Sequence, residues 1–481
     1  MSLLAIPEAG RRALGLLVEL GGTDRPLWLV GGAVRQLLGT EPLADLDVAL
    51  PEGAIVLGRR VADRLGARFV VLDEGRGAGR IVGGPDQAPP VDLVDFRAPT
   101  LDGDLRARDF TVNALAVPVA DLLRDGSAVV TDPTGGLADL RACVVRLCGP
   151  AAIVDDPVRA LRGVRLAMRS GWRLDPGAEA AIRAGAPLVA GVAAERVRDE
   201  LVGILGERQA AVGLRMLDRL GVLGALLPES APMRATAQPL PHHFDVWEHS
   251  IRAVEAVDAL LADLDALVPW GPALREHLDE HLGGGVSRRE ALRLAALLHD
   301  VAKPETRSEQ AGRVRFFGHD AAGARRAAAI AARLRLPRRT SQVLERLVAE
   351  HLRPMHLAQA GEITRRARFR FFRALGDDAP DLLLLALADA AALTGGSPLA
   401  VWAGEGGAVV RVLMAGADEE AAAATTPPLL RGEEVMDAFH LAPGPAVGRL
   451  LERAREAQAL GLVATREEAL DYLRRDRDPG A

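Results

Sequence analysis

The spacing of apolar residues along the chain changes character near residue 150. Before that point, short apolar runs, some alternating with period two, predict β-strands at 26–30, 45–50, 67–72 and 90–96. A helix is predicted over 31–39, directly after the first of these strands. Beyond this point, apolar residues recur every three or four positions, which is typical of amphipathic helices. The expected fold class is therefore α+β, with a mixed-sheet head followed by helical domains.

Breaks in this pattern indicate how the chain is divided. The stretch 73–90 is rich in Gly and Pro, which predicts a turn or a mobile loop between strands. The proline-rich segment 227–243 interrupts the helical pattern, and an Ala/Thr/Pro stretch at 421–428 interrupts it again. We predict a head at 1–145, a helical neck and body at 146–235, a second helical domain at 240–395 and a helical tail at 396–481.

Composition and charge exclude several classes of protein. With 481 residues, 26% of them charged, and a formal net charge of −6, the chain is expected to be a soluble multidomain protein. It is not a bulk binder of polyanions, so a nucleic-acid site must be a local basic patch. Its apolar runs are too short for a bilayer, its first residues lack a signal-peptide pattern, and it has only two cysteines. We therefore expect a cytoplasmic protein without membrane association, and we infer no obligate protein partner.

Two acids interrupt one of the predicted strands. Asp45 and Asp47 in ADLDVAL are two residues apart, so on a strand they face the same side. Like charges at this distance repel unless a cation lies between them, and Mg²⁺ is a cation that carboxylates prefer. Taken alone, such a pair is far more often two solvated acids at a strand edge. Asp92, on the strand predicted at 90–96, is a candidate third carboxylate.

The surroundings of the aspartates favour the metal interpretation. Gly31 and Gly32 lie between a strand and a helix, where bare backbone N–H groups can hold a triphosphate, and Arg35 follows one helical turn later. Downstream, RARDFTVNALA contributes a compact polar cluster, Arg108, Asp109 and Asn113. A glycine turn, paired aspartates and a third acid are the parts of two-metal nucleotidyl transfer.

Four motifs, in this order, resemble the tRNA nucleotidyltransferase and poly(A) polymerase family, in its bacterial–eukaryotic class. They are GGAVRQLLGTEPLADLD, RARDFTVNALA, DDPVRALRGVRLAMRSGW and ERVRDEL. The resemblance implies a polymerase β-like head that adds CCA to tRNA 3′ ends from CTP and ATP without a template, with Mg²⁺ at Asp45 and Asp47.

The same resemblance implies roles for residues of the later motifs. Asp156 and Arg159 match the positions that read the incoming base, with a carboxylate acceptor and a guanidinium donor. Arg162 would brace the base reader or the phosphates. Arg165 and Arg196 would contact RNA along the following helices, through phosphate, sugar and end shape.

Departures from the family pattern leave the product open. Gln36, Ala107 and Asp155 replace the usual residues without removing a metal ligand or a base-reading position. Only 98–103 separates Arg97 from Asp104, where members that add the whole CCA often have a long flexible segment. The resemblance implies that a shortened segment can impair the switch from C to A addition, so a CC-adding enzyme is an alternative. A poly(A) polymerase is another, which the net acidity of the chain argues against.

A second constellation lies in the helical part. His249, the adjacent His299 and Asp300, and Asp389 in a strongly apolar helix form an ordered set. A buried acid without a partner is costly, so a metal or another cation is expected beside Asp389. Each histidine alone would more often be structural. As a set, they resemble the HD-domain metal-dependent phosphohydrolases, with a divalent metal of unknown identity.

Further residues could extend this HD site. His319 and His351 are candidates for a second metal. Lys303, the only lysine in the chain, could contact a substrate phosphate or could equally be a snorkelling surface lysine. The resemblance implies hydrolysis of phosphomonoesters or cyclic phosphates. An alternative of another class is therefore a protein that is chiefly an HD phosphohydrolase with an RNA-binding head.

Overall fold

The computed structural model describes residues 6–22, 25–39, 43–84, 89–417 and 426–475. They divide into two compact units. The N-terminal unit is Met1–Ile204 with Met216–Leu226, and the C-terminal unit is Leu205–Arg215 with Leu227–Ala481. The finer division into four domains stays a prediction. Residues 85–88 and 421–425, which belong to two of the predicted breaks, lie outside the described residues.

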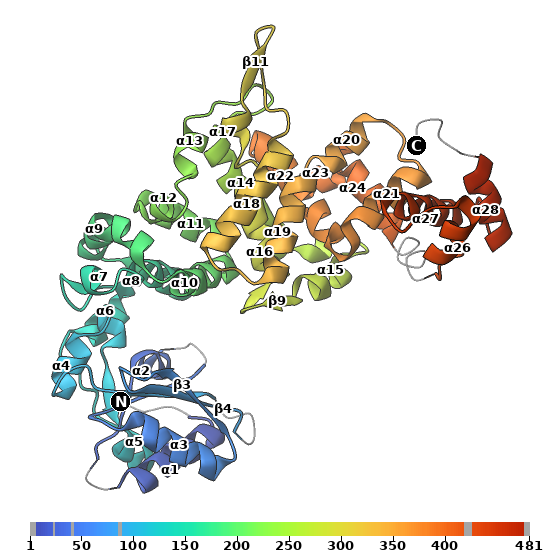
Figure 1. The fold of residues 1–481 in the computed structure, drawn as a ribbon. Helices are drawn as coiled ribbons and strands as arrows, with labels where there is room; N and C mark the ends of the chain where they lie inside the picture. The colour runs from blue at the N-terminus through green and yellow to red at the C-terminus, as the bar shows by residue number, and fades with distance from the viewer. Residues whose placement is uncertain (1–5, 23–24, 40–42, 85–88, 418–425, 476–481) are drawn as a thin grey trace. The chain divides into compact units, whose positions relative to one another are not determined.

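A six-stranded mixed sheet forms the head of the N-terminal unit (Figure 1). Its strand order is β3-β4-β5-β2-β1-β6. The strands are β1 Trp28–Val30, β2 Leu46–Leu50, β3 Arg68–Asp73, β4 Ala78–Val82, β5 Val91–Asp95 and β6 Ala116–Pro118. Only β2 and β5 run parallel; the other neighbouring pairs are antiparallel. The four strands predicted from the sequence are all present within one or two residues of their expected ends.

Alternation along β2 decides which side of the sheet carries the acids. Leu46, Val48 and Leu50 point into the main core of the head, against helices on one face. Those helices are α1 Glu8–Gly21, α2 Gly31–Leu38, α3 Ala54–Leu65 and α5 Val119–Asp125. Ala49 points the other way, into a smaller apolar cluster. Asp47 shares that second side because it lies two residues before Ala49.

The prediction of a loop over 73–90 is wrong for Ala78–Val82, which forms the strand β4. Its glycine is the reason that composition pointed to a loop. A Cβ on Gly79 would lie 2.2 Å from the ring of Phe69, so only glycine lets that ring pack against the strand. Ile81 is buried in the main core, while Arg80 faces the opposite side.

Helices make up the rest of the N-terminal unit, together with a short parallel pair, β7 Val144–Val145 and β8 Arg173–Leu174. Its other helices are α4 Leu101–Arg106, α6 Gly136–Ala142, α7 Ala152–Asp155, α8 Arg159–Ser170, α9 Pro176–Gly185 and α12 Val222–Leu226. The helices α10 Ala194–Gly206 and α11 Ala210–Arg219 each include residues of both units. On α8, apolar residues face the core and the arginines Arg162, Arg165 and Arg169 face away from it.

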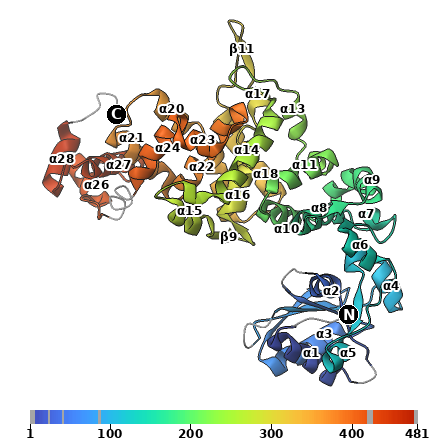
Figure 2. The same cartoon turned by 180° about the vertical axis from the view of Figure 1, so that it is seen from behind.

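The C-terminal unit is helical, as predicted (Figure 2). Its central helices are α14 Val246–Ala262, α16 Arg288–Leu298, α18 His319–Arg333, α19 Arg338–Glu350 and α22 Ala379–Thr394. The others are α13 Ser230–Arg234, α15 Gly271–Leu278, α17 Lys303–Thr306, α20 Arg353–Gln359, α21 Arg365–Leu375, α23 Pro398–Ala403 and α24 Ala408–Ala415. A last apolar cluster joins α26 Gly432–Phe439, α27 Pro445–Ala459 and α28 Arg466–Arg475. No helix among the described residues is long and apolar enough to cross a membrane.

Two short hairpins interrupt this helical part, which the helical periodicity did not predict. They are β9 His281–Gly283 with β10 Val286–Ser287, and β11 Ser308–Gln310 with β12 Arg313–Arg315. Residues with positive φ form both turns: Gly283 to Gly285 in the first, and Ala311 with Gly312 in the second. Such short strands leave no periodic signal in the sequence.

In the C-terminal unit, the buried carboxylates of Asp378 and Asp381 are expected to depend on the positive charge of Arg288. Its guanidinium is fully buried and donates to Asp378 (3.0 Å) and Asp381 (2.8 Å), both of which are also fully buried. Arg288→Met would leave two buried carboxylates undercompensated, at a cost of about 3–5 kcal/mol. Calorimetry should therefore show a clearly lower melting temperature. Arg339→Met, which removes a partly exposed partner of Asp378, is the control and should cost much less. Equal melting temperatures of the two variants would contradict this view.

Candidate active sites

The parallel pairing of β2 with β5 brings two predicted metal ligands side by side. Asp47 lies opposite Asp92 in the register, and Asp45 directly precedes β2. One carboxylate oxygen of each of the three residues lies within 4.8 Å of the other two. Burial, followed by the charges of Asp45 and Asp92, raises the pKa of Asp47 to about 6, against a lowering by Arg108. This carboxylate cluster suits a hard divalent cation such as Mg²⁺, which would relieve the repulsion.

We expect the cation-free protein to lose stability as the pH rises from about 4 to about 6. Folding raises the pKa of Asp47, so the folded state holds this proton more tightly than the unfolded chain, and ionisation then costs stability. Melting temperatures in a chelator across this range would measure the effect. Asp47→Asn should show a flatter profile, and Mg²⁺ should stabilise the wild type. Identical profiles for wild type and variant would contradict the assignment.

Asp47 and Asp92 line a cavity of about 260 Å³ in the N-terminal unit. The predicted residues that line it are Gly31, Gly32, Asp47, Asp92, Arg108, Asp109, Asn113, Asp156, Arg159 and Arg162. The structure therefore gathers the glycine turn, two of the acids and the polar residues of two later motifs around one space. A cavity lined by both carboxylates and arginines suits a phosphate ester with a bound cation.

Gly31 is required by the close approach of Asp47. Its φ is +67°, and a Cβ at this position would lie 3.0 Å from Oδ2 of Asp47. The sequence indicated a bare backbone N–H group at Gly31. Instead, the Gly31 N–H donates to the carbonyl of Leu115 (3.3 Å). The backbone N–H of Ala33, in the first turn of α2, stabilises the Asp47 carboxylate.

Arg35 lies outside the set of residues that line the cavity. Its buried guanidinium donates to Oδ1 of Asn113, and the Asn113 amide donates to Asp109 (3.2 Å). Burial alone would raise the pKa of Asp109, but Arg162 and these hydrogen bonds hold it below its usual value. Arg35 therefore has a contact through which it orients Asn113, and its contact with the nucleotide stays a prediction.

The two residues expected to read the base are neighbours. Nε of Arg159 lies 4.0 Å from Oδ2 of Asp156, and the Arg159 guanidinium also donates to the carbonyl of Ala107 (3.1 Å). Asp156 accepts a hydrogen bond from Arg196 (2.8 Å). Burial would raise the pKa of Asp156, but Arg196 lowers it below its usual value. Arg196, predicted to contact RNA, thus has a partner within the protein.

Two residues that contact the predicted site residues were not predicted from the sequence. Arg80 on β4 makes a bidentate ion pair with Asp92, through Nε (2.6 Å) and Nη2 (2.7 Å). Glu200 on α10 accepts from Arg162 (2.9 Å) and pairs with Arg165 (2.8 Å). Period-two alternation in AGRIV could have revealed Arg80, and Glu200 is the last acid of the ERVRDEL motif.

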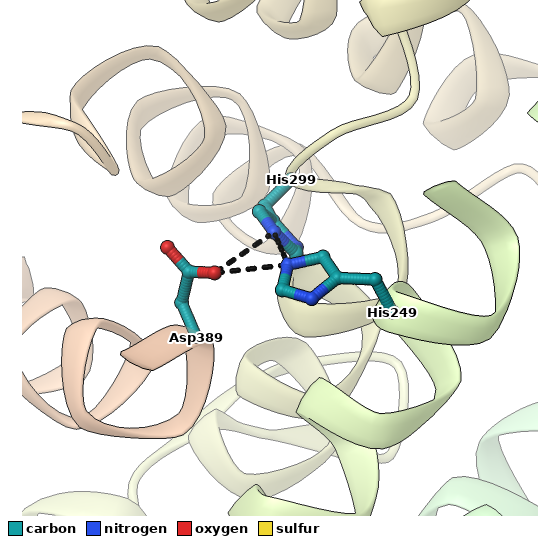
Figure 3. Close-up of side chains that lie close together, drawn as sticks. All are labelled: His249, His299 and Asp389. Carbon is teal, nitrogen blue, oxygen red and sulfur yellow. Dashed lines mark hydrogen bonds and ion pairs between the residues drawn. The ribbon is translucent and has the colours of Figure 1, made fainter. Parts of the chain in front are cut away.

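In the C-terminal unit, three predicted ligands from separate helices converge (Figure 3). His249 comes from α14, His299 follows α16, and Asp389 comes from α22. Nε2 of His249 lies 3.0 Å from Oδ1 of Asp389 and 3.2 Å from Nε2 of His299. Two imidazoles and a carboxylate facing one point form a ligand set for a transition metal or Mg²⁺.

A second set of ligands lies beside the first. His319 begins α18 and His351 follows α19, and their Nε2 atoms are 3.2 Å apart. Oδ1 of Asp300 lies 3.4 Å from Nε2 of His319, while its Oδ2 lies 3.2 Å from Nε2 of His299. Asp300 therefore joins the two sets, one oxygen to each. We call these six residues the HD cluster: His249, His299, Asp300, His319, His351 and Asp389.

Backbone carbonyls orient three of the imidazoles. Nδ1 of His299 lies 2.8 Å from the carbonyl of Ala296, and Nδ1 of His319 and His351 lie 2.7 Å from the carbonyls of Phe316 and Val348. When Nδ1 carries the proton and donates it to the carbonyl, Nε2 keeps a free lone pair. This tautomer points three nitrogen ligands into the HD cluster.

Electrostatics within the HD cluster also favour a cation. Burial opposes protonation of His299, but Asp300 and Asp389 outweigh it and raise its pKa to about 10. Burial and the neighbouring His299 lower the pKa of His351 to about 4.

Lys303, at 7% exposure, is not a surface lysine: its Nζ lies 2.6 Å from Oδ2 of Asp300.

Three family models match the chain in order. Residues 27–146 match "Poly A polymerase head domain", residues 171–233 match "Probable RNA and SrmB- binding site of polymerase A", and residues 246–393 match "HD domain". The first match contains the GGAVRQLLGTEPLADLD and RARDFTVNALA motifs, the second contains ERVRDEL, and the third contains the HD cluster, whereas most of the motif at 155–172 lies between the first two matches.

Named proteins are similar over nearly the full length. The chain is 37% identical over 464 residues to the A-adding tRNA nucleotidyltransferase of Deinococcus radiodurans, across 94% of this chain and 96% of that protein. It is 36% identical over 460 residues to the CC-adding tRNA nucleotidyltransferase of Thermus thermophilus, across 94% of each. The solved Thermotoga maritima CCA-adding enzyme complexed with tRNA aligns at a TM-score of 0.57 and 19% identity, across 97% of this chain and 95% of that one. The α+β expectation is confirmed.

Proposed function

Because this chain belongs to the tRNA nucleotidyltransferase and poly(A) polymerase family, we propose that its first site adds the nucleotides CCA to tRNA 3′ ends, using CTP and ATP. The chain is an enzyme of this family, as its motifs predicted. One observation carries the proposal: the carboxylates Asp47 and Asp92 and the pair Asp156 and Arg159 line the same cavity. A metal site and a base-recognition pair in one space are what transfer of a selected nucleotide needs.

The chemistry follows from what each residue offers. Asp45, Asp47 and Asp92 would hold two Mg²⁺ ions, which when bound supply an activated 3′-hydroxyl and a neutralised pyrophosphate. Arg108 and Arg162 line the cavity, where their charges can bind the triphosphate. Cytosine and adenine both present an amino donor beside a ring-nitrogen acceptor, which the Asp156 carboxylate and the Arg159 guanidinium can pair. Selection of the nucleotide then needs no template.

A second candidate, partial addition of CC only, is favoured by the segment between Arg97 and Asp104. This segment is short, and its two ends are joined because buried Asp104 accepts from the Arg97 N–H (3.0 Å). Within it, Thr100 caps α4 by accepting from the Gly103 N–H (3.2 Å). Asp104 also pairs with Arg108 (2.9 Å), a residue of the cavity. A segment fixed in this way has little freedom to adjust the site between C and A.

One assay separates these products. Purified protein, Mg²⁺ and labelled CTP or ATP would be offered to tRNA ending at the discriminator base, at C or at CC. A CCA end supports the main proposal, and growth that stops at CC supports the second candidate. Addition of A only to the CC-ended tRNA would make the chain an A-adding enzyme, and long A tails would make it a poly(A) polymerase. No incorporation by the wild type, matching an Asp45→Ala control, would refute nucleotidyl transfer.

For the HD cluster, the proposal is metal-dependent hydrolysis of phosphomonoesters or cyclic phosphates at RNA 3′ ends. Its support is the ligand set itself, with four imidazoles and two carboxylates converging in a buried site. Release of phosphate from a 3′-phosphorylated RNA, with Mg²⁺ or a transition metal added, tests it, with His299→Ala as the inactive control. The alternative of a protein that is chiefly a phosphohydrolase leaves the complete first site unexplained.

The proposed partners and location follow from these activities. tRNA, CTP and ATP are the substrates of the first site, and all three are found in the cytoplasm, which remains the proposed location. That the chain needs no obligate protein partner also remains a proposal.

A further inference from the structure

The hairpin β11–β12 projects from the helices of the C-terminal unit in both views (Figures 1 and 2). Its register pairs Ser308 with Arg315 and Gln310 with Arg313, so these four side chains share one face. That face carries two positive charges and no acid, because Glu309 pairs with Val314 on the other face. Both arginines are exposed.

An aromatic platform continues this basic face. Phe317, two residues after Arg315, is 65% exposed and is the one exposed aromatic side chain in the part of the chain that the structure describes. The Arg315 guanidinium lies over its ring, 5.3 Å from the centroid. An exposed ring that a neighbouring guanidinium holds in place offers a flat apolar face on which a planar ligand can stack.

The hairpin leads directly into the HD cluster. Phe316 accepts a hydrogen bond from Nδ1 of His319 (2.7 Å), and its ring lies 5.6 Å from Nζ of Lys303. Lys303 in turn contacts Asp300. One residue, Gly318, therefore separates the exposed ring of Phe317 from a ligand of the cluster.

We propose that this hairpin binds the single-stranded 3′ end of RNA and presents its terminal phosphate to the HD cluster. This inference rests on the proposed phosphohydrolase function and names the ligand of that site. A base stacks on Phe317, while Arg313 and Arg315 bind backbone phosphates. Two guanidinium groups in series beside one platform suit a chain of several nucleotides better than a single one. Stacking is tolerant of base identity, which fits ends of any sequence.

Binding can be measured without hydrolysis. The full chain, free of added metal, is titrated into a short RNA that carries 2-aminopurine at its 3′ nucleotide and a 3′-phosphate, which blocks extension. Stacking quenches the fluorophore. Phe317→Ala should weaken this binding at least about fivefold, and Phe317→Trp should restore it. Leu462→Ala, which truncates an exposed apolar side chain elsewhere, is the matched control and should leave binding unchanged.

Three outcomes overturn the proposal or part of it. Equal affinity of wild type and Phe317→Ala excludes the hairpin as an RNA site. If Phe317→Ala weakens binding of a nucleoside 3′-monophosphate as much as it weakens binding of RNA, and Arg313→Ala does not weaken binding, the site is one for free nucleotides. A loss of p-nitrophenyl phosphate hydrolysis in metal-loaded Phe317→Ala, beyond about twofold, means that the ring acts on the HD cluster itself. Failure of the wild type to hydrolyse any phosphoester refutes the phosphohydrolase function alone, because the fluorescence titration does not depend on it.

Discussion

Asp47→Asn is expected to lower nucleotide incorporation into tRNA by about a thousandfold or more. The substitution removes one charge from the carboxylate cluster, in which one oxygen each of Asp45, Asp47 and Asp92 lies within 4.8 Å of the others. A bound divalent cation contributes several kcal/mol to charge stabilisation in the transition state, and each 1.4 kcal/mol is a factor of ten in rate. Because asparagine is nearly isosteric, the fold should be kept. Primer extension under single-turnover conditions measures the loss.

The matched control for this prediction is Asp63→Asn, an exposed aspartate on α3 of the same head. It changes the net charge equally and should leave incorporation within about twofold. Phosphoester hydrolysis at the HD cluster provides a second control, since Asp47→Asn should not alter it. Comparable loss of incorporation in the two aspartate variants would show that the effect is one of net charge.

Asp300→Asn is expected to lower the rate of hydrolysis at the HD cluster about a thousandfold, while nucleotide incorporation continues. Asp300 is fully buried, and its two oxygens face different sets of imidazoles: Oδ1 lies 3.4 Å from His319, and Oδ2 lies 3.2 Å from His299. An amide can offer only its oxygen as a ligand, so one of the two sets would lose its charged partner. Hydrolysis and metal content per chain should therefore fall together.

Comparison with His351→Ala makes this prediction sharper. That variant removes a ligand of the second set alone, since His351 Nε2 lies 3.2 Å from His319 Nε2. If both sets hold metal during hydrolysis, the two variants should be similarly inactive. Full activity and full metal content in Asp300→Asn would show that the carboxylate does not join two metals. Glu305→Gln, exposed and close in sequence, serves as the control for charge.

The sequence predicted which polar side chains come together better than it predicted their supports. The three head acids, the candidate base-recognition pair and the six residues of the HD cluster were all singled out from the sequence, and the structure brings each set together. The partner of Asp92 escaped prediction because Arg80 lies in a glycine-containing strand that composition assigns to a loop. Which oxygen of Asp300 faces which histidine depends on helix packing, about which local spacing carries no information.

The burial of Lys303 has a practical consequence for labelling. It is the only lysine in the chain, and its amine is enclosed between Asp300 (2.6 Å) and Gln238 (2.7 Å). Amine-reactive dyes and crosslinkers therefore find no exposed lysine ε-amino group on the protein, because every other Lys or Arg position of the chain is an arginine. Conversely, any reaction at that one amine reports that the HD cluster has opened, so a single mass-spectrometric peak can follow local unfolding of this site.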